Sequence, residues 1–242
     1  MWMFSSCVVC GRPGACPCEA CIEALRPLAA GELSPPPPGI DGAAALCRYE
    51  GPAKELVTSL KFRNHRDALG ALGAALAVMG GPWMEGATLC WAPAEPTKAA
   101  RRGFDQGELL ARAVGAAAAR RLGQRCPVRP LLRREPTNLR HLPDVVPDVP
   151  GERLVRSIAA GQTGRTRRQR LSGPTLRPSG AVPGRIVVVD DVVTTGATLS
   201  RAAMALRAGG ARTVYSLCVA ATPDHAAHRE VSPAGSAHPP HR

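Results

Sequence analysis

The segment Arg185–Thr198, which reads RIVVVDDVVTTGAT, is the most informative stretch for the fold of this chain. Its apolar run from Ile186 to Val189 has the β-branched, continuous character of a central parallel strand that is buried on both faces. Asp190 and Asp191 follow at the carboxyl end of this run, and the small residues after them open a helix. Because a helix N-terminus attracts phosphate, the segment predicts a strand, a phosphate-binding loop and a helix in succession.

The residues that follow extend this unit. The predicted helix places Leu199, Ala203 and Leu206 on one face and ends at Gly209-Gly210. The next apolar segment, from Thr213 to Ala220, has the composition of a second strand. A strand, a loop, a helix and a strand in this order are typical of an α/β domain with a parallel sheet.

The order of acids and loop fits a sugar that carries a phosphate. Asp190 and Asp191 can accept hydrogen bonds from a pair of vicinal ribose hydroxyls, while the loop surrounds a 5′-phosphate. The loop residues are Thr194, Thr195, Gly196, Ala197 and Thr198. The whole pattern resembles the 5-phosphoribosyl-1-pyrophosphate (PRPP) signature of type I phosphoribosyltransferases. The alternative is an ordinary buried strand that ends in solvated acids, and the chain lacks the Gly-Lys-Ser/Thr of a P-loop.

Composition sets the limits for domain number and partners. A chain of 242 residues with 45% hydrophobic content predicts one main α/β domain and a small appendage. The net charge of +12 and the pI near 10.0 suit polyphosphate ligands or nucleic acid. The stretch Arg153 to Arg177 holds seven arginines and no acid, and it is interpreted either as a phosphate contact or as a solvated stretch. It includes an arginine cluster at Arg165, Arg167, Arg168 and Arg170.

The sequence predicts neither a secretory signal nor a membrane span, which favours the cytoplasm as the expected compartment. The segment Met1 to Ser6 is too short for the apolar region of a secretory signal, and no membrane span is predicted. The longest bland stretch, Ala68 to Gly81, has the length of a packed helix. In a reducing compartment, clustered cysteines argue for a metal before a disulfide.

The N-terminus contains two Cys-x-x-Cys pairs. The four predicted ligands of a structural zinc ion are Cys7, Cys10, Cys18 and Cys21. Gly11 lets the chain turn after the first pair, and Cys16 is an alternative ligand to Cys18 with a poorer chelate spacing. Redox or incidental cysteines are the alternative interpretation. Four further cysteines in apolar surroundings are expected to be buried thiols, namely Cys47, Cys90, Cys126 and Cys218.

Proline and glycine divide the chain into segments. The run Pro35 to Pro38 followed by Gly39 predicts a stiff linker that separates the core of the knuckle from that of the main domain. The predicted units are a zinc-binding knuckle (1–34), a proline-rich linker (35–43), the main domain (44–223) with a loop insertion (134–165), and a disordered tail (224–242). Within the main domain we expect strands at 44–49 and 88–92. We also expect one helix that Gly51-Pro52 starts and that runs to Phe62, and a second helix over 68–79.

A basic segment, Lys98 to Gln106, is predicted to be a loop that Gly103 closes before the helix Gly107 to Leu122. Several motifs occur in a distinctive order: the paired cysteines, Tyr-Glu-Gly-Pro, Leu-Lys-Phe, Arg-Arg-Gly-Phe-Asp-Gln-x-Glu-Leu-Leu-Ala and the PRPP loop. This order resembles the ComF (competence protein F) family between Cys7 and Thr222. The segment Trp91-Ala92-Pro93-Ala94 departs from the Val-Pro-Val-Pro-like run of that family, as does Asp105, where the family commonly has Asn.

The resemblance implies a type I phosphoribosyltransferase-like fold, which is a parallel sheet flanked by helices, with a small N-terminal zinc knuckle. It also implies that PRPP, or a nucleotide containing ribose 5-phosphate, binds with Mg²⁺ over Asp190, Asp191 and the loop. A nitrogen acceptor would then displace pyrophosphate, whose charge Lys98, Arg101 and Arg102 would stabilise.

A second function class follows from the same resemblance. In it the fold is a non-catalytic accessory module for the uptake of single-stranded DNA in natural transformation, with competence machinery as partners. The basic charge and the zinc knuckle suit this role. An aromatic content of only 3% leaves few stacking platforms for bases and counts against autonomous single-strand binding.

Overall fold

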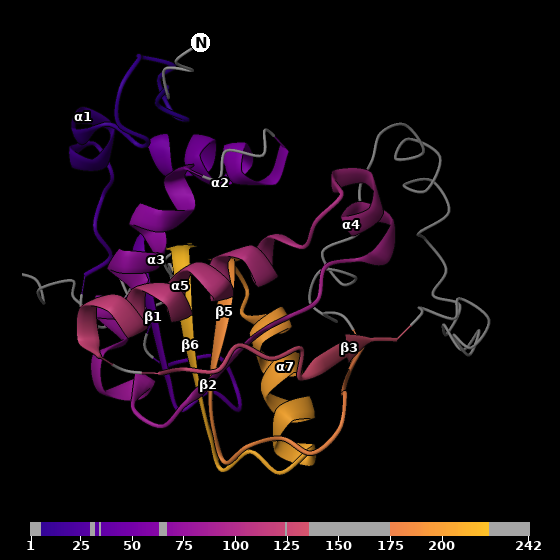
Figure 1. Ribbon diagram of the computed structural model, residues 1–242. Coiled ribbons are helices and arrows are strands. Elements are labelled where there is room, and N and C mark those ends of the chain that lie inside the picture. Colours follow the sequence, from indigo (N-terminus) through magenta and orange to yellow (C-terminus); the bar gives the residue numbers. More distant parts are fainter. Residues whose placement is uncertain are drawn as a thin grey trace, which may run out of the picture.

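A four-stranded parallel sheet forms the centre of the molecule (Figure 1). The computed structural model describes residues 6–29, 32–33, 35–62, 67–123, 125–135 and 175–222. The order of the strands in the sheet is β1-β6-β5-β2, and every neighbouring pair is parallel. Their bounds are β1 Gly42–Arg48, β2 Thr88–Trp91, β5 Arg185–Val193 and β6 Thr213–Ala221. This is the fold class that the sequence predicts.

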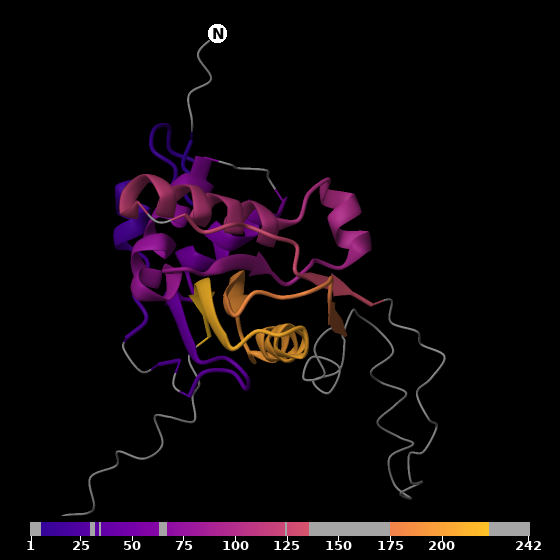
Figure 2. The ribbon, with the colours of Figure 1, turned by 60° about the horizontal axis from the view of Figure 1, so that its bottom comes forward.

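Helices cover both faces of the sheet. The first face is covered by α2 (Pro52–Phe62), α3 (Asp67–Gly80) and α5 (Gln106–Leu122). The second face is covered by α7 (Ala197–Ala208), and Figure 2 shows α5 and α7 on opposite sides of the strands. The remaining helices are short: α1 Glu19–Glu23, η1 Gly81–Met84 and α4 Pro96–Arg102.

The central strand β5 owes its position to its apolar run. Val187 and Val189 pack against the α3 and α5 side, and Ile186 and Val188 pack against the α7 side. All four side chains are fully buried, as a strand with neighbours on both sides and helices on both faces requires. The strand does not end at the two acids, as the sequence pattern indicated. It continues to Val193 because its pairing with β6 continues beyond them.

The segment 98–106 was predicted to be a basic loop, but it is mostly helical, so this prediction is wrong. The helix α4 begins with Pro96 at its first turn and ends at Gly103, which has a left-handed conformation with φ +75°. Proline suits the start of a helix and glycine its end, so both residues act as helix signals here. The helix α5 then begins at Gln106, one residue earlier than expected.

A small antiparallel ribbon lies beside the main sheet. It pairs β3 (Leu132–Arg134) with β4 (Leu176–Pro178), and the backbone N–H of Glu135 donates to the carbonyl of Thr175 at 3.0 Å. Most of the predicted insertion at 134–165 and the predicted tail at 224–242 lie outside the described residues. The arginine cluster at 165–170 lies outside them too.

The N-terminal knuckle packs directly on the main domain. Val8 is only 4% exposed and belongs to the core that α2, α3 and α5 build. The backbone N–H of Arg48 donates to the carbonyl of Arg26 at 2.8 Å, which fastens the knuckle to the end of β1. The expectation that the proline linker separates two cores is therefore wrong, because the hydrophobic side chains of the knuckle are too few to bury one another and instead use the main core.

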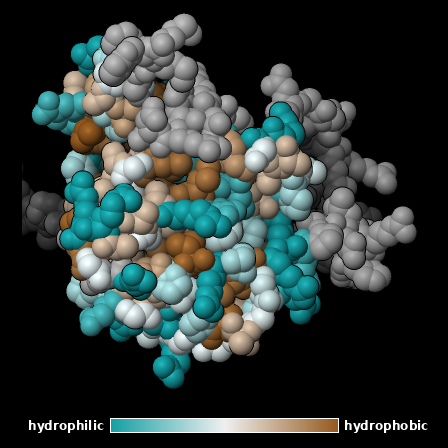
Figure 3. Space-filling view, viewed as in Figure 1, coloured by the Kyte–Doolittle hydropathy of each residue, from teal (hydrophilic) through white to brown (hydrophobic). Residues whose placement is uncertain are grey.

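The helices of the described residues are short or polar. None of them combines the length and the apolar composition that a bilayer crossing needs. On the face seen in Figure 3, hydrophilic side chains lie between smaller hydrophobic areas. The large hydrophobic side chains that are exposed are single residues on different elements, namely Ile22, Val78, Leu122 and Met204.

Candidate functional site

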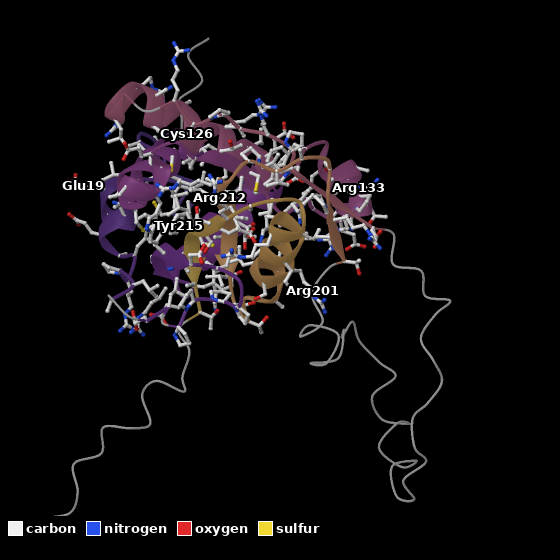
Figure 4. The ribbon with its side chains drawn as sticks, turned by 90° about the horizontal axis from the view of Figure 1, so that it is seen from below. Glu19, Cys126, Arg133, Arg201, Arg212 and Tyr215 are labelled. Atoms are coloured by element: carbon white, nitrogen blue, oxygen red, sulfur yellow. The ribbon has the colours of Figure 1, made fainter. Side chains whose placement is uncertain are left out.

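A pocket of about 380 Å³ lies where β5 passes into α7. It is lined by one acid and by the predicted phosphate loop with its neighbours. The lining residues are Asp190, Val192, Val193, Thr194, Thr195, Gly196, Ala197, Thr198 and Leu199. The structure therefore brings Asp190 and all five predicted loop residues together around one cavity. Arg212 and Tyr215 lie at the other end of the strands, at the start of β6, which Figure 4 shows from below.

The loop has the geometry of an anion site at a helix N-terminus. Gly196 is the N-cap residue of α7, with φ +70°, and offers no side-chain cap, while the hydroxyl of Thr195 accepts from the N–H of Ala197 at 3.4 Å. The hydroxyl of Ser200 donates back to the carbonyl of Gly196 at 3.0 Å and fixes the first turn. Thr194 and Thr195 are exposed. The N–H groups and hydroxyls of this turn can therefore face a phosphate.

The proline segment contacts this loop. A Cβ placed on Gly196 would lie 2.8 Å from Cγ of Pro37, so no larger residue fits there without displacement. Glycine is thus needed at 196 for two reasons, the left-handed conformation and the approach of Pro37. The sequence predicts Pro37 as part of a linker and gives no sign of its contact with Gly196.

The two acids of β5 have different partners. Asp190 lines the pocket on the α7 side, and its Oδ1 accepts a hydrogen bond from the backbone N–H of Asp191 at 2.8 Å. The carboxylate of Asp191 instead pairs with Lys61 of α2, with 2.8 Å between Oδ2 and Nζ. The Asp191 side chain is 13% exposed and that of Lys61 is 26% exposed, so this ion pair is mostly shielded from solvent. The sequence predicts a helix up to residue 62 but no connection of Lys61 with the site.

Asp190 holds its proton more tightly than an ordinary aspartate. Burial is the main cause, and the negative charge of Asp191 adds to it, so that the pKa of Asp190 rises to about 7. Lys61 acts in the other direction, as a positive charge close to an acid should. Acids with such raised pKa values occur preferentially at ligand-binding and catalytic sites.

The segment after β2 approaches the same edge of the sheet. Asp105 is the N-cap of α5: its Oδ1 accepts from the N–H of Gly107 at 2.9 Å, and its Oδ2 accepts from the N–H of Ala94 at 2.8 Å. One carboxylate thus fastens the loop after β2 to the start of α5, and its charge raises the pKa of Asp190 slightly. Gln106 follows with a side chain that is buried, and neither polar atom of its amide has a hydrogen-bond partner in the described residues.

The predicted pyrophosphate-binding cations lie on α4. Arg101 and Arg102 are in its last turn, and Nζ of Lys98 lies 3.2 Å from Oε2 of Glu95. The helix buries none of its residues, and Figure 1 shows it at the upper right, beyond the strands. None of these three cations is among the described residues that line the β5–α7 pocket. Their role stays a prediction.

The four predicted zinc ligands converge. The sulfur atoms of Cys7, Cys10, Cys18 and Cys21 all lie within 4.8 Å of one another. Four thiolates around one tetrahedral ion would have bonds of about 2.3 Å, which this cluster accommodates with small adjustments. Cys16 is outside the cluster, so the structure favours Cys18 as the ligand. The residues thus fit a closed, structural zinc site.

Backbone geometry supports this site. The turn after the first pair is closed by the N–H of Gly11, which donates to the carbonyl of Cys7 at 2.8 Å, and Gly11 has φ +75°. The N–H of Cys18 donates to the sulfur of Cys7 at 3.3 Å. Although burial opposes its ionisation, hydrogen bonds from backbone groups such as that of Cys10 lower the pKa of the Cys7 thiol to about 6. The side chain of Arg12 lowers the pKa of Cys10. Thiolates are the form that binds metal.

The other predicted thiols are buried as expected. Cys47, Cys90, Cys126 and Cys218 are each at most 7% exposed. Burial raises the pKa of Cys47 to about 11 and also raises that of Cys126. These side chains therefore act as small apolar groups of the core.

Comparison with known proteins identifies the class of this fold. Residues 149–234 match the family model of the phosphoribosyl transferase domain, which is less than half of the chain. The chain also resembles the purine phosphoribosyltransferase from Pyrococcus horikoshii Ot3, with 16% identity, a TM-score of 0.31, and coverage of 64% of this chain and 72% of that chain. No curated protein sequence matches the chain.

The matched residues include β5, the two acids, the loop and α7. Together with the parallel sheet flanked by helices, they give the chain a phosphoribosyltransferase fold, and a cluster of four cysteines lies near its N-terminus. The ComF family is a finer assignment than these comparisons make.

Proposed function

We propose that the protein binds PRPP and transfers its phosphoribosyl group to a nitrogen acceptor with release of pyrophosphate. The observation that carries this proposal is the pocket that joins Asp190 to the loop Thr194–Thr198. In it the 5′-phosphate would lie at the N-terminus of α7, and the ribose hydroxyls would donate to the acids of β5. The match to a phosphoribosyl transferase domain supports the same substrate.

The reaction itself exchanges one bond for another at the anomeric carbon. The bond from that carbon to the pyrophosphate oxygen breaks with its electron pair, and a nitrogen lone pair forms the new bond through an oxocarbenium-like state. The contribution of the protein is positional and electrostatic. Asp190 and Asp191 hold the ribose, and the loop holds the phosphate, so that the anomeric carbon faces the acceptor.

Charge on the departing pyrophosphate needs cations. Mg²⁺ commonly binds through substrate phosphates with one or two protein carboxylates, and the donor set of Asp190 and Asp191 has that chemistry. When bound, Mg²⁺ would withdraw charge from the leaving group. We assign the same task to Lys98, Arg101 and Arg102 of α4, which follow the end of β2 in the sequence.

Calorimetric titration with PRPP and Mg²⁺ tests the binding step. We expect the Asp190→Asn, Asp191→Asn double variant to lose on the order of a hundredfold in affinity, because each charge-assisted hydrogen bond contributes about 1.5–3 kcal/mol. The control is Glu85→Gln, which removes an exposed acid just before β2 at the opposite edge of the sheet. Equal affinities of the wild type and the double variant would reject the ribose assignment.

A screen of nucleobases for pyrophosphate release tests turnover. If the α4 cations act on the leaving group, neutralising all three should lower kcat more than it lowers PRPP affinity, since that charge develops in the transition state. No described residue favours the DNA-uptake role. Salt-sensitive binding of single-stranded DNA that depends on Arg165, Arg167, Arg168 and Arg170, without transferase activity on any base, would replace the enzyme proposal.

A further inference from the structure

One helix, α2, contacts both the cysteine knuckle and Asp191, one of the two acids of β5. Ser59 and Lys61 lie two residues apart near its C-terminal end. Ser59 contacts the knuckle and Lys61 contacts Asp191. The two proposed sites are far apart in the sequence but contact residues that lie within one turn of the same helix.

The contact with the knuckle is a buried hydrogen bond. The hydroxyl of Ser59, in a residue that is 1% exposed, donates to the carbonyl oxygen of Val8 at 2.8 Å. Val8 lies between Cys7 and Cys10, so its carbonyl belongs to the loop that would close around the metal. Leu56 and Leu60 of α2 are buried in the core that also contains Val8. A hydrogen bond and a shared core thus join α2 to the loop that would hold the metal.

The contact with the site is the ion pair between Lys61 and Asp191. Without a cation, the adjacent carboxylates of Asp190 and Asp191 within β5 would repel each other. Lys61 offsets this repulsion and fixes the direction of the Asp191 side chain, with 2.8 Å between the charged atoms. The pair is mostly shielded from solvent, which makes its interaction stronger than that of an exposed pair.

We propose that Lys61 is a positioning residue for the ribose-binding carboxylates, and that the metal-loaded knuckle holds Lys61 in place through α2. Metal occupancy of the four cysteines then sets the affinity for PRPP at a distance. This inference rests on the proposed function, because PRPP binding is its readout.

A cycle of variants on the full-length protein tests the link to Asp191. We expect Lys61→Met to weaken PRPP binding by on the order of tenfold, and Lys61→Arg to restore most of it. In the Asp191→Asn background, Lys61→Met should have little further effect, because the partner charge is already gone. The matched control is Lys54→Met, an exposed lysine on the same helix. An unchanged affinity in Lys61→Met would overturn the proposal.

Removal of the metal tests the link to the knuckle. Zinc-loaded and chelator-treated protein are compared by calorimetry with PRPP and by hydrogen exchange of the α2 amides. We expect loss of zinc to weaken PRPP binding by the wild type and to speed exchange in α2, and to change PRPP binding by Lys61→Met much less. An equal loss in both proteins would show that the knuckle does not act through Lys61. If the zinc-loaded wild type binds no PRPP, the proposed function fails, and the hydrogen exchange of α2 still decides whether the metal orders this helix.

Discussion

The two faces of the sheet build their parts of the site in different ways. On the α7 face, the acid, the loop and the helix come from one continuous segment, Arg185–Ala208. On the other face, the charge environment comes from Lys61 of α2 and Asp105 before α5, which are far apart in the sequence. Asp190 belongs to the first face and Asp191 to the second. The residues of the proposed ligand pocket are therefore close together in the sequence. The ionisation and orientation of the two acids depend instead on tertiary contacts.

The faces also differ in what stabilises them. On the α7 face the helix buries one side, which includes Leu199, Ala203 and Leu206, and its exposed Arg201 lies away from the sheet in Figure 4. The other face carries the knuckle, whose loop has few apolar residues and would depend on a bound ion. Disturbing the second face should thus affect stability and ligand binding together.

The largest effect is expected from loss of a metal ligand. Cys7→Ser should abolish stoichiometric zinc binding and lower the free energy of unfolding by at least about 3 kcal/mol, because Val8 leaves the common core when the loop opens. Elemental analysis and urea denaturation measure the two effects. Cys16→Ser should keep the metal, since Cys16 lies outside the sulfur cluster. Unchanged stability of Cys7→Ser would mean that the knuckle is independent of the main core.

A second test addresses the packing of the helices on this face. A Cβ on Gly73 of α3 would lie 2.6 Å from the backbone carbonyl carbon of Ala113 in α5, so Gly73→Ala should cost about 1–3 kcal/mol. Gly70, one turn earlier, has no atom within 4 Å of its Cβ position, and Gly70→Ala should stabilise the protein by about 0.5–1 kcal/mol. Thermal denaturation of the two variants measures this contrast. Similar effects in both would show that α3 and α5 are not in close contact.

The sequence predicted most of the elements because their signals are local. The apolar run Ile186–Val189, the small residues after the acids and the stop at Gly209 each act within a few residues, and the structure confirms them. The helix α4 was not predicted because its basic residues were interpreted as a loop. Pro96 at its start and Gly103 at its end are ordinary helix signals.

Other features of the site depend on contacts that no local pattern records. The ion pair of Lys61 with Asp191 and the contact of Pro37 with Gly196 join segments that only the folded chain brings together. Charge at a helix end and proline in a linker have many uses, so neither residue type indicates such a partner in advance. The docking of Val8 on the main core has the same cause.

A third prediction concerns pH and the boundary between the faces. The pKa of Asp190 is raised to about 7 in the folded protein, mainly by burial, from an ordinary value of 3.8. The folded state therefore binds this proton more tightly than the unfolded state, and stability falls as the pH rises from about 4 through 7. Asp190→Asn should thus stabilise the protein more at about pH 8 than at about pH 4. Urea denaturation at both pH values measures this, and an equal gain at both would show that Asp190 titrates normally.

The smallest expected effect is at Gln106, the first residue of α5. Its side chain is 4% exposed, and neither the amide nitrogen nor the amide oxygen has a hydrogen-bond partner in the described residues. Because an unsatisfied buried polar group costs free energy, Gln106→Met, which keeps the length of the side chain, should raise the stability of the ligand-free protein by about 1 kcal/mol. Gln106→Glu is the control: it places a charge in the same buried position and should destabilise the protein, since Asp105 and the acids of β5 lie on the same edge of the sheet. Thermal denaturation distinguishes the two variants. A loss of stability in Gln106→Met would show that the amide of Gln106 has a hydrogen-bond partner in the folded protein before any ligand binds.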